Sequence, residues 1–262
     1  MQIDDNPFRP PSARLYDYSE SNFGTFIPEG RLVSAGSGLQ WLLRGWEMFR
    51  TAPGTWIGIA VAFMAVMLIA GMLPLLNILA NLLIPVFIGG ISVGCRAIEE
   101  GEGIRFEHLF AGFSRQPGGL LMVGLLYLLA LLVVAVAVGI IATVTGIAAL
   151  ATIGLDGAGS TAAWAVVVSF LAMILVFAPL AMAVWLAPPL LLFHELSAYQ
   201  AIKTGVLVAL RNFPSFLVYV LLVLVAAVLA SLPLLLGWLV LLPVLYASLY
   251  AAYRELFFAE HR

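Results

Sequence analysis

Four long stretches of this 262-residue sequence contain no Asp, Glu, Lys or Arg. They lie between Arg50 and Arg96, Arg115 and Asp156, Asp156 and Glu195, and Arg211 and Arg254. Each stretch exceeds the ~20 residues with which a helix crosses ~30 Å of hydrocarbon. Only 10% of all residues are charged, against roughly 25% in soluble domains. The sequence therefore predicts an integral membrane protein.

The apolar stretches predict an all-α, polytopic membrane protein with six transmembrane helices in three hairpins. Gly and Pro, which interrupt helices, mark turns at residues 71–74, 156–160 and 231–237. The expected spans cover residues 55–73, 76–96, 118–146, 162–193, 214–231 and 234–255, within a transmembrane domain at residues 37–262.

The third and fourth apolar stretches are longer than a bilayer requires. Straight helices over residues 118–151 and 162–193 would each be near ~48 Å at 1.5 Å per residue. One interpretation is tilt, or a kink at Pro179 and Pro188. The other is an apolar hairpin that leaves the outer leaflet around residues 140–164, and then lies on it or meets a partner. Both interpretations stay open.

The basic residues all lie on one side of this topology. The twelve Lys and Arg residues precede span 1, follow span 6, or lie between spans 2 and 3 or spans 4 and 5. Cytoplasmic segments beside spans are enriched in Lys and Arg. We therefore expect a multi-pass protein of the bacterial inner (plasma) membrane with both termini in the cytoplasm. Residues 1–36 are polar and turn-rich, which favours a mobile cytoplasmic tail.

An amphipathic segment precedes the first, third and fifth spans. In residues 39–50 apolar side chains recur at helical spacing with charges opposite, and Ser37 or Gly38 is the expected cap. Residues 106–115 repeat this pattern, and the third segment opens with a capping box formed by Ser197 and Gln200. Each segment is expected to lie as a helix in the cytoplasmic interface.

The three amphipathic segments share an ending in which Arg is followed by Pro. These pairs are Arg50 and Pro53, Arg115 and Pro117, and Arg211 and Pro214. Pro suits the first turn of a new helix, and Arg can extend to lipid headgroups. A second similarity links spans 2 and 6, where Pro85 and Pro243 stand eleven residues before Arg96 and Arg254. We interpret the unit of interfacial helix, corner and hairpin as an internal repeat present three times.

Groups that support catalysis or ion transport are scarce. No span carries an ionisable residue in its interior, where proton relays and ion paths place them. His108, His194 and His261 fall in separate segments, and the single Cys95 is expected to be buried. No catalytic motif or metal-ligand spacing is visible. We therefore expect no catalytic residue, cofactor or metal, and the net charge of −2 gives no reason to expect a nucleic-acid partner.

Two sets of residues remain as candidate sites. Charged residues at the cytoplasmic ends of the spans are candidate contacts for lipid headgroups, namely Arg50, Arg96, Arg115, His194, Glu195, Arg211 and Arg254. Converging interfacial helices would bring His194 and Glu195 to face several of these arginines; the other interpretation is a solvated ring of charges that fixes topology. The candidate helix-packing positions are Gly90, Gly94, Pro85 and Pro243.

Two segments carry a resemblance to a known family. Residues 187–202 read APPLLLFHELSAYQAI and continue to Arg211-Asn212-Phe213, and residues 88–96 are followed by FEHLFAGF at residues 106–113. Over roughly residues 37–255 the chain resembles multi-pass bacterial inner-membrane proteins of the YciC-like type. These are similar to the membrane domain attached to some glycerophosphoryl diester phosphodiesterases, whose soluble domain is missing here. The resemblance implies an envelope or lipid-related role and no particular reaction.

The expected function is therefore that of a non-enzymatic integral inner-membrane protein that engages membrane lipids or serves as a scaffold in envelope homeostasis. Its expected partners are membrane lipids, together with a membrane-protein partner or a second copy of the chain. The alternative is a transporter or permease for an uncharged or lipophilic solute. A third hypothesis, an enzyme acting at the interface, would depend on His194 and Glu195.

Overall fold

The computed structural model describes residues 24–151, Trp164 and residues 181–259. These residues form helices and, apart from an isolated bridge between Phe26 and Phe258, no β-structure. Five helices are long and apolar enough to cross a membrane. They are α2 (Pro53–Gly71), α3 (Pro74–Glu99), α5 (Pro117–Ala151), α8 (Phe213–Ser231) and α9 (Trp238–Phe257). The expected fourth span, residues 162–193, is described from residue 181 onward, as the helix Ala181–His194.

Proline and glycine set most of the helix ends. Pro53, Pro74 and Pro117 each begin a helix, where a missing N–H costs nothing and φ is already helical. Helix α2 ends at Gly71, and α8 ends at Ser231, just before the Pro-containing segment 232–237. An arrangement in three hairpins needs six spans, and the described residues contain five candidates. The three hairpins therefore stay a prediction.

Helices α3 and α9 lie inside the bundle, and α2, α5 and α8 lie outside it. The most apolar windows of α3 and α9 are both 67% buried, against 28% for α2, 17% for α8 and 11% for α5. The helix Ala181–His194 belongs to the inner group, because most of its residues from 183 to 191 are buried. Exposed Leu and Val side chains cover the outer helices, and an apolar surface of this extent is typical of contact with lipid or with another protein.

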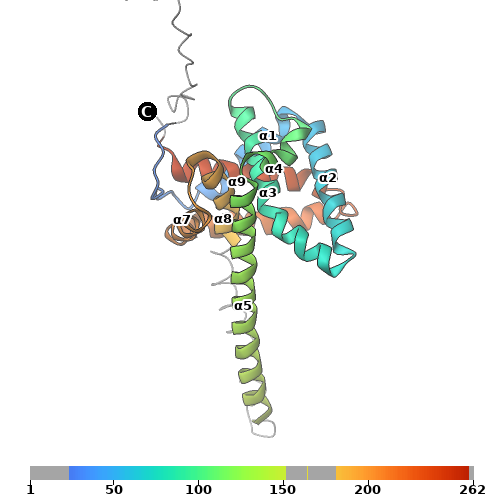
Figure 1. Cartoon of the computed structure of the whole chain (residues 1–262), viewed down its shortest axis with the longest axis vertical. Helices are drawn as coiled ribbons and strands as arrows, with labels where there is room; N and C mark the ends of the chain where they lie inside the picture. The colour runs from blue at the N-terminus through green and yellow to red at the C-terminus, as the bar shows by residue number, and fades with distance from the viewer. Residues whose placement is uncertain (1–23, 152–163, 165–180, 260–262) are drawn as a thin grey trace, which may run out of the picture.

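Helix α5 extends well beyond the other described helices along the long axis of the molecule (Figure 1). Its first turns pack inside the bundle, where Leu120 and Val123 are fully buried. Gly124 lies so close to the carbonyl of Leu82 in α3 that no side chain fits between the two helices. Further along, exposed apolar side chains recur between Leu125 and Val144.

The first amphipathic helix, α1 (Ser37–Thr51), packs along α9. A Cβ at Gly45 would lie 2.5 Å from the carbonyl oxygen of Val244, so the two backbones are in direct contact. The expected cap by Ser37 or Gly38 is wrong. Gly36 is the N-cap and has no side chain with which to cap the helix, and the Ser37 hydroxyl donates to Glu255 at 2.8 Å instead of to the start of α1.

The second amphipathic segment is not one helix. It consists of the 3₁₀ helix η2 (Phe106–Phe110) and the single-turn helix α4 (Ala111–Arg115). Pro117 limits its length, because proline disfavours a helical conformation in the preceding residue, and Gln116 has φ −146° and ψ 60°. The third segment, α7 (Ala198–Arg211), begins with the expected capping box of Ser197 and Gln200.

Each amphipathic segment packs against one of the inner helices through a glycine. Gly45 lies on the carbonyl of Val244 in α9, and Gly112 of α4 lies on the carbonyl of Val86 in α3. Val86 and Val244 directly follow the two prolines whose spacing the sequence repeats. In α7 the equivalent residue is Gly205, whose Cβ would lie 3.0 Å from the Cα of Ala183. Each copy of the proposed repeat therefore packs its amphipathic segment on an inner helix through a glycine.

Residues 24–36 differ from the mobile tail expected for residues 1–36. They run across the start of α8 and the end of α9, where the amides of Ile27 and Arg31 donate to the carbonyls of Phe257 and Leu256, both at 2.8 Å. The buried side chain of Asn212 accepts from the amide of Val33 at 2.8 Å and donates to the carbonyl of Arg31 at 3.1 Å. We call residues 24–36 the N-terminal strap. Residues 1–23 lie outside the described part of the chain.

Candidate functional site

Two charged pairs lie where the inner helices α3 and α9 meet. Glu99 of α3 accepts a hydrogen bond from the Tyr250 hydroxyl at 2.9 Å and forms an ion pair with Arg254 of α9 at 3.0 Å. Arg96 pairs with Glu100 one turn further along α3, at 2.8 Å. Ion pairs that are partly shielded from water hold helix ends more firmly than exposed ones do. Glu99 therefore joins the ends of α3 and α9, and the second pair lies at the end of α3 itself.

His194 lies in an aromatic environment beside these pairs. Its Nε2 is 2.6 Å from the hydroxyl of Tyr253, and its ring stacks on Phe26 with the centroids 3.5 Å apart. Partial burial, with the nearby guanidinium of Arg96 as a second cause, lowers the pKa of His194 to about 4. Both effects disfavour the charged imidazolium, so His194 is neutral at pH 7.

The remaining headgroup candidates lie in different surroundings. Glu195 is exposed, with φ 52°, and ends the helix that carries His194. Arg211 is exposed and donates to the carbonyl of Glu29 in the N-terminal strap at 3.4 Å. Arg115 is exposed at the end of α4, where its charge contributes to lowering the pKa of the buried His108. Of the expected arginines, Arg96 is the one that lies close enough to influence His194.

The four expected packing residues are all buried within the chain. Gly90 lies against the carbonyls of His108 and Leu109, and a Cβ at Gly94 would lie 3.0 Å from the Ile104 side chain. Pro85 and Pro243 lie inside α3 and α9. The glycines thus bring the segment 104–109 onto α3.

Glu255 is a structural residue that the sequence analysis missed. Its carboxylate accepts from the Ser37 hydroxyl and from the Trp41 indole, both at 2.8 Å, and its carbonyl accepts from Arg31 at 2.6 Å. Trp41 is fully buried against Phe216 of α8, with ring centroids 4.9 Å apart. Glu255 thereby ties the N-terminal strap and α1 to α9.

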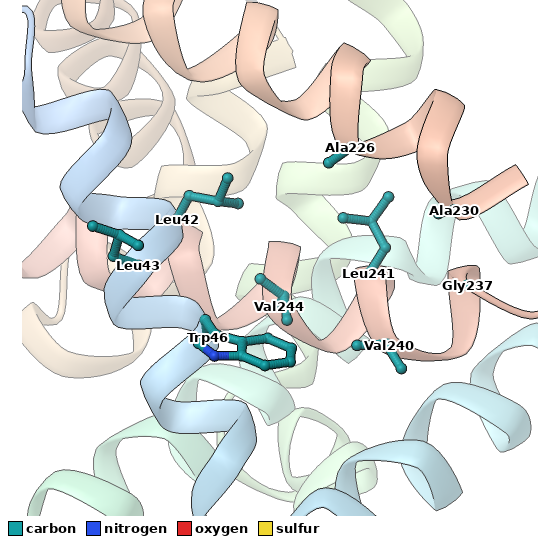
Figure 2. Close-up of a pocket in the computed structure, with 9 residues that line it drawn as sticks. All are labelled: Leu42, Leu43, Trp46, Ala226, Ala230, Gly237, Val240, Leu241 and Val244. Carbon is teal, nitrogen blue, oxygen red and sulfur yellow. The ribbon is translucent and has the colours of Figure 1, made fainter.

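A second feature is an apolar groove of about 430 Å³ between α1, α8 and α9. Figure 2 shows its lining side chains, with Trp46 of α1 across from α9 and Ala226 of α8 above them. The complete lining is Leu42, Leu43, Trp46, Ala226, Ala230, Gly237, Val240, Leu241 and Val244. A groove of this size and character accommodates an apolar ligand. We call it the α1 groove.

Metal and nucleophilic chemistry find little support among the described residues. No group of three His, Cys, Asp or Glu side chains lies close enough to hold a metal ion there. Cys95 is fully buried inside α3. The α1 groove and the charged ends of the inner helices are therefore the features on which a function can be built.

Comparison with known proteins finds a relative that matches most of the chain. The chain is 28% identical over 250 residues to a probable inner membrane protein of Burkholderia thailandensis, and the match covers 86% of this chain and 92% of the relative. No protein-family model and no solved structure matches the chain.

The apolar helices and this relative together define the class of protein. A chain whose outer helices expose leucine and valine to their surroundings, and which matches an inner membrane protein along most of its length, is a multi-pass integral protein of the inner membrane.

Proposed function

We propose that this chain is a non-enzymatic inner-membrane protein that engages lipids through the α1 groove. The observation that carries the proposal is the all-apolar lining of the groove, bounded by an amphipathic helix on one side and by a hairpin with exposed apolar side chains on the other. An acyl chain is the apolar ligand available at highest concentration in a membrane. Residues that could hold its headgroup lie on the same face of α1.

Arg50 is the headgroup candidate best placed for this role. It follows Trp46 by four residues, so both side chains lie on the same face of α1. Its side chain is exposed, and within the described residues it has no hydrogen bond or ion pair. A guanidinium with unused donors beside an apolar groove suits a phosphate whose acyl chain enters that groove.

The non-enzymatic part of the proposal is supported by the surroundings of His194. Its Nε2 contacts the Tyr253 hydroxyl, and one face of its ring is covered by Phe26. A catalytic base needs a path to its substrate, and this imidazole instead joins the N-terminal strap to α9.

The proposed topology has three hairpins that enter the membrane from the cytoplasmic side, with both termini in the cytoplasm. Five candidate spans and the one-sided placement of the basic residues support it, as does the resemblance to YciC-like inner-membrane proteins. The expected number of six spans assumes that both helices of every hairpin cross the membrane completely.

Native mass spectrometry of the purified protein tests lipid engagement. Ala226→Phe would fill the α1 groove, and we expect it to lose retained phospholipid. Val225→Phe is the matched control, because Val225 is 60% exposed on the same helix and does not line the groove. Equal phospholipid retention by both variants and the wild type would contradict the proposal. Arg50→Ala should weaken retention of anionic phospholipid, and Arg50→Lys should restore part of it.

A further inference from the structure

Helix α1 accompanies α9 from its cytoplasmic end almost to the hairpin turn. At one end, Ser37 and Trp41 donate to the carboxylate of Glu255. In the middle, Gly45 touches the backbone of Val244. At the other end, Trp46 shares the α1 groove with Gly237, the residue that directly precedes α9.

This arrangement limits how deeply the α8–α9 hairpin can enter a bilayer. Beyond Val244, α9 continues for only six residues toward its start at Trp238, or about 9 Å at 1.5 Å per residue. The hydrocarbon layer is about 30 Å thick. If the hairpin crossed it, α1 would be drawn into the hydrocarbon too.

The charges of α1 oppose such an immersion. Arg44, Glu47 and Arg50 lie along the part of α1 that flanks the outer half of α9, and Glu47 and Arg50 are exposed. Charged side chains inside the hydrocarbon are costly and rare. An amphipathic helix is stable in the interface, where its charges reach water. The position of α1 therefore keeps the hairpin close to the cytoplasmic interface.

The turn between α8 and α9 is suited to hydrocarbon rather than to water. Residues 231–237 read SLPLLLG, and Leu232, Leu234, Leu235 and Leu236 are each more than 60% exposed. A turn that emerged into the periplasm would present four leucines to water, which soluble surfaces avoid. Nothing in this turn is charged.

The polar groups of this turn are largely satisfied from within it. The amides of Leu232, Leu235 and Leu236 donate to nearby carbonyls at 2.9–3.3 Å, and Pro233 has no amide hydrogen. The Ser231 hydroxyl donates to the carbonyl of Ala227 at 2.8 Å and accepts from the Trp238 indole at 3.1 Å. Backbone exposed to lipid is costly wherever its hydrogen bonds are not satisfied, and the hydrogen bonds of Leu232, Leu235 and Leu236 lower that cost in this turn.

We infer that the α8–α9 hairpin is re-entrant: it enters the cytoplasmic leaflet, places residues 232–237 among acyl chains, and returns to the same face. Helix α5 contrasts with it, because its 35 residues extend far beyond α1 and are long enough to cross. The inference goes beyond lipid engagement and revises the depth of one hairpin in the proposed topology.

Thiol labelling in cells tests the inference. In a Cys95→Ala background, Leu234→Cys probes the hairpin turn, Lys203→Cys reports the cytoplasm, and Ser160→Cys reports the turn expected outside. We expect an impermeant maleimide to label Leu234→Cys neither in cells with a permeabilised outer membrane nor in inside-out vesicles, although it reacts fully after denaturation. Labelling of Leu234→Cys from either aqueous face would overturn the inference. Leu236→Cys provides an independent second probe.

Two further measurements make the test quantitative. A nitroxide at position 234 should be more accessible to oxygen than to a water-soluble nickel chelate, at a depth near the bilayer centre. A depth at the periplasmic headgroups would overturn the inference. Glu47→Cys should react in inside-out vesicles, since α1 lies in the cytoplasmic interface; protection of this thiol would show that α1 is immersed and would also overturn it.

Discussion

The ring of His194 lies on the ring of Phe26, with the two planes inclined by only 11°. This contact joins the N-terminal strap to the end of an inner helix. Burial lowers the pKa of His194 to about 4, so the stacked form is the neutral imidazole. The contact is therefore sensitive to protonation.

Acid should weaken the fold through His194. Its pKa is near 6.5 when unfolded and about 4 in the folded protein, so the folded state binds protons less readily. The stabilisation is complete above about pH 6.5 and is lost as the pH falls toward 4. Thermal unfolding in detergent should show a melting temperature that declines across this range, with a smaller decline in His194→Gln.

His108 provides the comparison for this experiment. Burial, followed by the charge of Arg105, lowers its pKa as well, so His108→Gln should remove a separate part of the same decline. Protection of the strap amides Ile27 and Arg31 from hydrogen exchange distinguishes the two histidines. Acid should expose these amides in the wild type through His194, and His108→Gln should not alter that exposure. If the melting temperature of His194→Gln declined with pH just as that of the wild type does, His194 would not be the group responsible.

Gly45 should be intolerant of even a methyl group. A Cβ there would meet the carbonyl oxygen of Val244 at 2.5 Å and the Cβ of Ser248 at 2.8 Å, so Gly45→Ala forces α1 away from α9. Overpacking of this kind costs about 1–3 kcal/mol. Gly54→Ala is the matched control, because nothing lies within 4 Å of its added Cβ. Denaturant titration should show a lower stability for Gly45→Ala and little change for Gly54→Ala.

Asn212→Ala should release the N-terminal strap. The buried amide group holds the Val33 N–H and the Arg31 carbonyl, and its loss leaves both unpaired, at a cost of about 1–3 kcal/mol. Limited proteolysis should then cut within residues 24–36. Asn77→Ala, at an exposed position near the start of α3, should leave the strap protected. Identical digestion of both variants would show that Asn212 does not hold it.

The helices could be located from the sequence because local chemistry determines their ends. Pro53, Pro74 and Pro117 each begin a helix, and the Ser197 capping box lies where its spacing predicts. The glycine contacts could not be predicted from the repeat alone. The structure was needed to show that Val86 and Val244 lie against Gly112 and Gly45. A repeated Pro-Val pair indicates that α3 and α9 are equivalent, but it does not identify the segment that packs against each pair.

The strap and its anchors could not be predicted in the same way. Asn212 and Val33 are 179 residues apart in the chain, and Glu255 and Trp41 are 214 apart. Asn212 and Glu255 belong to no periodic pattern in the sequence. A polar segment with no apolar face also has the same sequence pattern whether it packs against the bundle or is free. The interruption between η2 and α4 was equally hidden, because the aromatic spacing of residues 106–113 also fits a continuous helix.

The pairing of α1 with α9 has a consequence for biosynthesis. Trp41 leaves the ribosome long before Glu255, its hydrogen-bond partner 214 residues later, and at ~5–20 residues per second the delay is roughly 10–40 s. During that interval the face of α1 that packs on α9 lacks its final partner and must be sheltered by the membrane surface, by the insertion machinery or by the helices already translated. The final packing of the first helix therefore waits for the last one to be translated.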